Sequence, residues 1–283
     1  MRTSLKALAV ALVILSSACA HGVPTEGTRS GHASPVPGGT SLTRTIRLPL
    51  DAYTLSNAEQ ALVDNAQDEL TGDCMRTHGF RWPALRRSAP DMIPVNSRRY
   101  GITDLADAQK YGYRLNPRQA ADVDAVRKQS AQLSPAQKTT GSSCARKAYD
   151  RLHTGVAEVD FTLWNTVNKS SFEQARDSAV VASAIHAWSR CMHRSGFDFP
   201  DPLAAVNDPA FSSGADASPH EVDVAAADAA CKESTALTTA WSTAERRIQQ
   251  KLIAARPGYF DSVKKENVTL VAAAHRILPA SNG

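Results

Sequence analysis

The residues best suited to chemistry in this chain of 283 residues are its cysteines, with the histidines that follow two of them. Cys74 stands four residues before His78, and Cys191 stands two residues before His193. Thiolate and imidazole are ligands of zinc and copper sites in proteins. A repeated ligand would keep its place in both motifs, whereas the histidine does not, and zinc-finger spacing is absent. We therefore expect disulfides here, and we assign no metal site, no cofactor and no catalytic residue.

A second candidate for chemistry is a run of arginines within nineteen residues, accompanied by a tryptophan and a tyrosine. Guanidinium groups bind phosphate and carboxylate through paired hydrogen bonds, and they also stack on aromatic rings. The run therefore predicts a loop that contacts an anionic cell-envelope polymer or a lipid headgroup. The alternative is a solvated loop whose arginines offset nearby acidic residues. The arginines are Arg81, Arg86, Arg87, Arg98 and Arg99.

Sequence motifs for known reactions are missing. The chain contains no G-x-S-x-G, no H-E-x-x-H, no phosphate-binding P-loop and no glycine-rich dinucleotide loop. These are the patterns by which nucleophilic, metal-dependent and nucleotide-dependent enzymes are most readily recognised. We expect a binding or structural protein without catalysis. The alternative is an exported enzyme or metal-handling protein whose site forms between two helical units.

The first eighteen residues have the pattern of an export signal. Two basic residues precede an apolar run, residues 7–15, which is shorter than the roughly 20 residues that span a bilayer. The sequence Ser-Ser-Ala-Cys that follows resembles the bacterial lipobox, although serine replaces the more common leucine three residues before the cysteine. We expect residues 1–18 to be a signal peptide and Cys19 to carry the lipid. Cleavage after residue 20 would instead release a secreted protein.

The cysteine count agrees with this location. Lipidation accounts for one of five cysteines and leaves an even number, suited to two disulfides outside the cytoplasm. Loss of residues 1–18 removes two of the 32 basic residues, so 30 basic and 28 acidic residues give a net charge of +2. This near-neutral charge argues against a nucleic-acid partner. The expected partners are the membrane, through the lipid on the outer face, and an envelope polymer or protein. The cysteines are Cys19, Cys74, Cys144, Cys191 and Cys231.

An internal duplication indicates which elements position these cysteines. Residues 74–83 and 191–200 share Cys-Met-x3-Gly-Phe-x2-Pro at identical spacing. Glycine can end a helix in the left-handed conformation, and proline prevents its continuation. Capping-box patterns, Ser-x-x-Glu, occur upstream at 56–59 and 170–173 and predict where the two helices begin. The methionine of each motif, Met75 or Met192, is expected to fill the core.

A second pair of matched features predicts the partner helices. Ser134 lies ten residues before Cys144, and Ser218 lies thirteen residues before Cys231. Each serine is followed directly by a proline. Serine at the N-cap with proline next to it favours the start of a helix. Each copy is then helix, loop, helix, with one cysteine on each helix. Of the three possible pairings, the repeat favours Cys74–Cys144 and Cys191–Cys231.

The rest of the chain completes an all-α expectation, because no stretch shows sustained alternation of apolar and polar residues. Residues 19–50, rich in Gly, Pro, Ser and Thr, are expected to be a flexible tether. Two helical units should follow, at 51–169 and 170–283. Smaller expectations are a short helix within 100–113 capped by Thr103, a loop at 204–218, and two closing helices separated at 256–258.

Taken together, these segments resemble an uncharacterised family of exported proteins from actinobacteria, many of them lipoproteins. The resemblance rests on the lipobox-like cysteine, the two Cys-Met-x3-Gly-Phe motifs, RRYGITDLADAQKYGY at 98–113, and ADAACKESTALTTAWSTAERRIQQKL at 227–252. It covers residues 55–278. The resemblance implies an exported location and a helical fold, and it brings no activity and no site residue.

Overall fold

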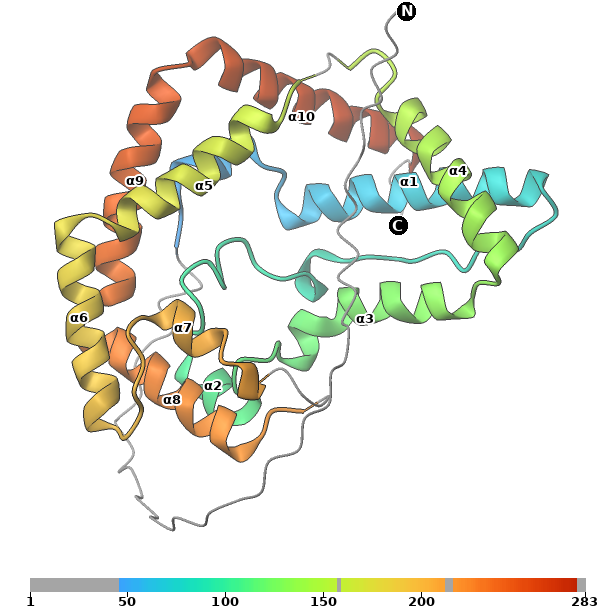
Figure 1. Ribbon diagram of the computed structural model, residues 1–283. Coiled ribbons are helices and arrows are strands. Elements are labelled where there is room, and N and C mark those ends of the chain that lie inside the picture. The colour runs from blue at the N-terminus through green and yellow to red at the C-terminus, as the bar shows by residue number, and fades with distance from the viewer. Residues whose placement is uncertain (1–45, 157–158, 212–215, 279–283) are drawn as a thin grey trace, which may run out of the picture. The chain divides into compact units, whose positions relative to one another are not determined.

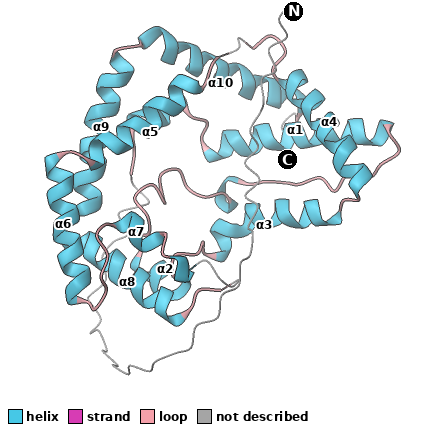
Figure 2. Cartoon of the chain, viewed as in Figure 1, coloured by secondary structure: helices cyan, strands magenta, loops and turns pink. Residues whose placement is uncertain are grey.

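A computed structural model of the chain describes residues 46–156, 159–211 and 216–278. Within these ranges every regular element is a helix and none is a strand, which confirms the all-α expectation (Figures 1 and 2). Short 3-10 turns occur at η2 (Pro49–Tyr53), η3 (Ala89–Asp91) and η4 (Pro209–Phe211). The α-helices are α1 (Asn57–Thr77), α2 (Leu105–Tyr111), α3 (Pro117–Gln132), α4 (Pro135–Leu152), α5 (Thr162–Arg176), α6 (Ala179–Arg194), α7 (Pro202–Val206), α8 (Pro219–Ser234), α9 (Leu237–Ala254) and α10 (Pro257–Ile277).

The first motif ends α1 as its sequence predicts. Gly79 adopts φ +76°, and the amide of Phe80 donates to the carbonyl of Met75 over 3.0 Å. This reversed bond satisfies a carbonyl that the helix end would otherwise leave unpaired. Cys74, one turn before the end, forms a disulfide with Cys144 of α4. The side chain of Met75 is fully buried, as expected.

The second motif ends α6 with the same geometry. Gly196 has φ +90°, and the amide of Phe197 donates to the carbonyl of Met192 over 3.0 Å. Cys191 is joined to Cys231 of α8. Both disulfide pairings favoured by the repeat are therefore confirmed. The starts of the cysteine helices are also confirmed, because Ser134 caps α4 and Ser218 caps α8.

One expected helix start is wrong. Ser56 and Glu59 form the capping box of α1, but the matching pattern at 170–173 lies inside α5. Helix α5 buries Val167, Ser171 and Ala175 along one face against α9, and this continuous buried face carries the helix through the serine. Helix α6 begins instead after Ser178. Tertiary packing has outweighed a local capping signal.

Other boundaries also move. Leu48 and Leu50 are buried at the start of the described body, so residues 46–50 do not belong to the tether. The cap of α2 is Asp104, which accepts the amide of Asp107, rather than Thr103. The loop expected at 204–218 contains the end of α7 and the turn η4, whose Phe211 is buried. Asp208 accepts the amide of Ala210 in η4, and Asp201 caps α7. Both elements are too short to show a periodic apolar pattern in the sequence.

Helices from the two copies pack against one another. Helix α5 lies along α9, α2 along α8, and α10 along α1 (Figure 1). The division expected between residues 169 and 170 falls inside α5, and the described residues belong to one compact unit. One core gathers around Trp188, Met192 and Trp241, and a second lies under α1, α4 and α10. None of the described helices is long and apolar enough to cross a membrane.

Candidate functional site: a loop held by two buried carboxylates

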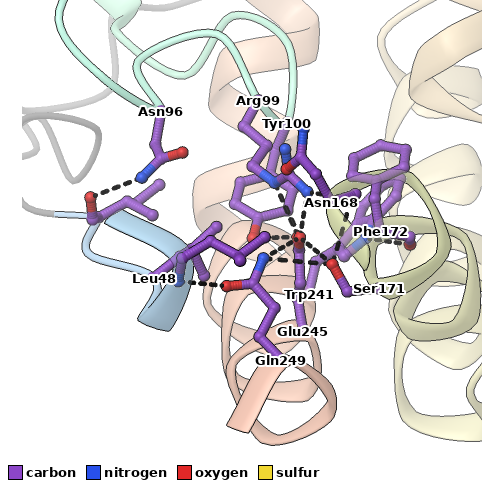
Figure 3. Close-up of polar contacts among 12 residues, drawn as sticks. Leu48, Asn96, Arg99, Tyr100, Asn168, Ser171, Phe172, Trp241, Glu245 and Gln249 are labelled. Carbon is purple, nitrogen blue, oxygen red and sulfur yellow. Dashed lines mark hydrogen bonds and ion pairs between the residues drawn. The ribbon is translucent and has the colours of Figure 1, made fainter. Parts of the chain in front are cut away.

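The loop between η3 and α2, residues 92–104, is held by contacts from distant parts of the chain. Its first attachment is Arg99, whose Nε lies 2.9 and 3.0 Å from the two oxygens of Glu245 on α9 (Figure 3). Arg99 Nη2 also bonds to this carboxylate and donates to the carbonyl of Asn168 on α5 over 2.8 Å. The guanidinium lies 5.4 Å from the ring centroid of Phe172. The loop is thus bound to α5 and α9 at once.

Glu245 is completely buried and its carboxylate is surrounded by donors. Tyr100 donates from 2.8 Å, Ser171 Oγ lies at 3.1 Å, and Gln249 Nε2 lies at 3.0 Å (Figure 3). With Arg99, four side chains use the acceptor capacity of one carboxylate. Burial and the nearby Glu245 charge raise the pKa of Tyr100, so the phenol stays protonated and keeps donating. Glu245 is therefore a structural centre with no lone pair left for a substrate.

Gln249 extends this network to the beginning of the described chain. Its Oε1 accepts the backbone amide of Leu50 over 3.0 Å, while Asn96 in the loop donates to Asp51 over 3.0 Å. Figure 3 shows the contacts of Glu245 and Gln249 coming from the loop, α5, α9 and the start of the described chain. The network explains why residues 46–50 are ordered parts of the body.

A second buried carboxylate, Asp228 on α8, holds the loop three residues further along the chain, at Ile102. Lys232 Nζ lies 2.8 Å from Asp228 and donates to the carbonyl of Ile102 over 3.0 Å. Trp188 of α6 and Tyr113 donate to the same carboxylate over 2.9 and 3.2 Å. Asp228 and Lys232 are essentially inaccessible, and burial raises the pKa of Asp228 and lowers the pKa of Lys232. Their pairing and hydrogen bonds oppose both shifts.

Gly101 shows how closely the loop approaches this ion pair. It adopts φ +78°, a conformation that side chains disfavour, and a Cβ atom there would lie 2.7 Å from Nζ of Lys232. Glycine is therefore required by conformation and by space. The sequence pattern around 100–113 gave no indication of this second requirement, because the lysine is 131 positions further along the chain.

Two pockets share the loop as a wall, through Pro94, Ser97 and Arg98. The first, which we call the α3 pocket, has a volume of about 450 Å³ and is lined by Asp104 and Asp107 and by polar residues at the start of α3. The second, the α5 pocket, has a volume of about 560 Å³. Arg98 faces both pockets, and the side chains that line the α5 pocket but not the α3 pocket include Arg99, Lys169, Phe172 and Arg176.

The five arginines expected to form one anion-contact loop have different environments. Arg86 pairs with Glu69 over 2.9 Å on the surface, and Arg87 pairs with Asp122 over 3.0 Å. Arg81 is exposed. Only Arg98 and Arg99 line the α5 pocket, and Arg99 is committed to Glu245. The arginine run therefore supplies one ligand-facing candidate, Arg98, and several groups that hold the fold together.

The cysteine and histidine candidates are also placed. Ligand atoms of Cys74, Cys144 and His78 lie within 4.8 Å of one another, but the two sulfurs are bonded together and are not thiolates. His193 is exposed beside Asp198, with 3.3 Å between Nδ1 and the carboxylate. The two histidines accordingly stand at different sites, each near one disulfide. Cys19 and the expected signal peptide lie outside the described residues.

Sequence reasoning missed Glu245 and Asp228, although a signal was present for the first. Trp241, Glu245 and Gln249 follow Leu237 at steps of four, so two polar residues continue an apolar stripe. A charged group on such a stripe is buried only when it is paired. Asp228 has one local partner, Lys232 four residues later on α8, but an i,i+4 pair is equally common on exposed helix faces. Its burial depends on partners from α6 and from the loop before α3.

Chemically, the arrangement favours recognition over catalysis. The two buried carboxylates are occupied by hydrogen bonds within the protein, whereas groups lining the two pockets are open to a ligand. Comparisons with models of known protein families, with curated proteins and with solved structures find no match.

Proposed function

We propose that this protein is an exported lipoprotein, anchored through Cys19 to the outer face of the cell membrane, whose helical body binds a component of the envelope. The observation that carries the proposal is the state of the other four cysteines. All four are paired in disulfides between neighbouring helices, which leaves Cys19 as the odd cysteine of the five. Disulfides of this kind persist in oxidising compartments. They are compatible with a location outside the cytoplasm.

Three features of the sequence support the same location. The basic and apolar leader precedes a lipobox-like segment, and residues rich in glycine, proline and serine follow the cysteine. The resemblance to an exported actinobacterial family points the same way. Removal of the leader also brings the net charge to +2, which suits an envelope partner better than a nucleic acid.

The binding role rests on the loop between η3 and α2. A recognition surface must be held in place before the ligand arrives, because ordering it during binding reduces affinity. Buried networks at Glu245 and Asp228 hold residues 99–102 of this loop on three helices. The α3 pocket along it has a volume within the roughly 300–1,000 Å³ typical of small-molecule sites, and the α5 pocket has a similar volume but is more open to solvent. A fixed loop beside two pockets supports binding without requiring catalytic groups.

The proposed location is tested by substitution of the anchor. Wild-type protein and the Cys19→Ala variant would be produced in a bacterium that processes lipoproteins, and both would be fractionated. We expect the wild type in the membrane fraction and the variant released with an unchanged melting temperature, because the substitution leaves the helical body intact. Membrane association of the folded variant would contradict the anchor. A matched Ser17→Ala variant should remain membrane-bound, since alanine is also a small residue before the cysteine.

A further inference from the structure

We infer that the α5 pocket binds a phosphate group. This inference deepens the proposed binding role and names the chemistry of its ligand. The pocket lies where the loop meets α5, and four cationic side chains and one carboxylate, Glu173, line it. The cations come from two separate segments, so they can approach one group from different sides. The cationic residues are Arg98, Arg99, Lys169 and Arg176.

Arg98, Lys169 and Arg176 each have N–H donors beyond those used in their hydrogen bonds within the protein. Arg98 uses Nη2 for the carbonyl of Arg114 and for Gln119, and Arg176 uses Nη2 for Asp201. A guanidinium has five N–H donors, so each arginine has others to offer. The Nζ atom of Lys169 lies 3.8 Å from Glu173, beyond hydrogen-bond distance, and its side chain is 77% exposed. The donors of Lys169 are the least engaged of the three.

Arg99 has a different role in the pocket. Its guanidinium is bound to Glu245 and rests over Phe172, so it fixes the wall formed by the loop and α5. Glu245 and Asp201 offset the charges of Arg99 and Arg176, so the field of the pocket is moderate. Recognition then depends on the number and direction of N–H donors. A phosphate monoester has three terminal oxygens, and a diester has two terminal and two bridging oxygens around a tetrahedral centre, so either can use donors from more directions than a planar carboxylate.

The pocket also has an apolar side. Ile93, Pro94, Phe172 and Leu203 line it beside the cations, and Ile93 remains partly exposed at the rim. A ligand whose phosphate is attached to a carbon skeleton would contact both parts of the lining. Such a group occurs in phospholipid headgroups and in free phosphate esters. The shared chemistry is the phosphate monoester or diester, and the experiment below separates the two sources.

The first arm measures binding of glycerol phosphate to the exported full chain by calorimetry or by nuclear magnetic resonance titration. We expect saturable binding that weakens at least tenfold in the double variant Lys169→Gln and Arg176→Gln. The matched control is Lys264→Gln with Lys265→Gln, which removes the same charge from exposed positions of α10. We expect the control to bind within twofold of the wild type. Melting temperatures of both variants establish that the fold is retained.

The second arm uses the Cys19→Ala chain, which lacks the anchor, with vesicles containing phosphatidylglycerol or only phosphatidylcholine. Selective binding to phosphatidylglycerol that glycerol phosphate displaces would identify a headgroup as the source. Binding of glycerol phosphate without vesicle binding would identify a free ester. Absence of saturable binding to both probes, or an equal loss in the pocket and control variants, would overturn the inference. None of these outcomes depends on whether Cys19 is lipidated.

Discussion

The two copies of the cysteine motif use the same backbone geometry and differ in the polar contacts around it. In α1 and in α6, glycine ends the helix, the following phenylalanine amide returns to the methionine carbonyl, and the cysteine is bonded to a second helix. The position three residues before the second cysteine is Gly141 in one copy and Asp228 in the other. A tryptophan packs against Gly141 and a different one hydrogen-bonds to Asp228, which makes the two sites directly comparable.

The origin of that tryptophan differs. Trp82 comes from the end of the first motif, beyond α1, lies over Gly141, and donates to Asp68 of α1 over 2.8 Å. Trp188 comes from α6 itself and donates to Asp228 of α8 over 2.9 Å. A tryptophan–aspartate hydrogen bond is thus present in both copies, but it joins different elements in each. The helix stop and the disulfide fix the hairpin, whereas the polar contact inside it can be built in more than one way.

The second copy adds Lys232 and thereby reaches the loop of the first. The ion pair with Asp228 places Nζ on the carbonyl of Ile102, and α2 packs along α8. The loop that lines both pockets therefore belongs to the first copy in sequence, but side chains of the second copy hold much of it in place. This exchange agrees with the finding that the described residues belong to one compact unit.

The largest effect is expected from breaking this ion pair. Lys232→Met leaves Asp228 charged and buried without its partner, and removal of one member of a buried pair costs about 3–5 kcal/mol of unfolding free energy. Urea unfolding would measure the loss. Adding Asp228→Asn should recover part of the stability, because no uncompensated charge then remains. As a control, Arg86→Ala breaks an exposed pair with Glu69 and should cost about 0–1 kcal/mol.

A loss below about 1 kcal/mol for Lys232→Met would contradict the buried pair. The contrast between the two copies would then lose its main physical basis.

Removal of each disulfide should have the next largest effect. Replacing both cysteines of a pair by alanine is expected to cost about 2–4 kcal/mol, because the cross-link restricts the unfolded chain. The bonds span 70 and 40 residues, so the chain-entropy model makes the Cys74–Cys144 pair the more stabilising by about 0.5 kcal/mol. Chemical unfolding of the two paired variants would give both values. A much smaller loss for either pair would show that the corresponding helices are held by packing alone.

Packing at Gly141 provides a smaller test of the first copy. A Cβ atom there would lie 3.0 Å from the Trp82 ring, so Gly141→Ala should cost about 1–2 kcal/mol despite the better helix propensity of alanine. Gly258, in the first turn of α10, has no atom within 4 Å of the corresponding position. Gly258→Ala should therefore be neutral or stabilising. Thermal unfolding of both variants beside the wild type would measure the two effects. Equal effects at the two glycines would contradict the Trp82 contact.

The smallest effect concerns pH and the capping boxes. Hydrogen bonds from the Ser56 backbone and hydroxyl lower the pKa of Glu59. A carboxyl whose pKa is lowered by folding adds stability above its unfolded pKa and loses it as the pH falls through the folded value. In α4 the same position is Gln137, which does not titrate. Glu59→Gln should therefore reduce the acid sensitivity of unfolding, with a change below about 1 kcal/mol at neutral pH.

Parallel measurements of unfolding free energy at pH 3 and pH 7 would test this prediction. An unchanged pH dependence in Glu59→Gln would show that the carboxylate contributes nothing to the cap.

The sequence was informative where structure depends on neighbours along the chain. The repeated motif predicted two helix ends and, through the repeat, two disulfides; the caps at Ser56, Ser134 and Ser218 are local signals that the fold keeps. The signal at Ser170 failed because the face of α5 that packs on α9 continues past it. A local sequence signal predicts an element only where tertiary packing does not favour a different boundary.

The candidate site was less accessible to such reasoning. The arginine run drew attention to Arg98 and Arg99, yet it could not distinguish the arginine bound to a buried carboxylate from the one with donors to spare. Glu245 lies 146 positions from Arg99, and Lys169 of the α5 pocket lies 71 positions from Arg98. These distances along the chain are closed only by the packing of α5, α9 and the loop.

The most direct test of the central claim is the intact mass of the exported protein, measured with and without reductant after treatment with a thiol label. We expect the mass of a chain that starts at Cys19 and carries a diacylglycerol group on that residue. We expect no thiol label before reduction and four labelled thiols afterwards. Free thiols in the untreated protein, together with bound metal, would contradict it and would move Cys74, His78 and Cys144 from a structural to a metal-binding role.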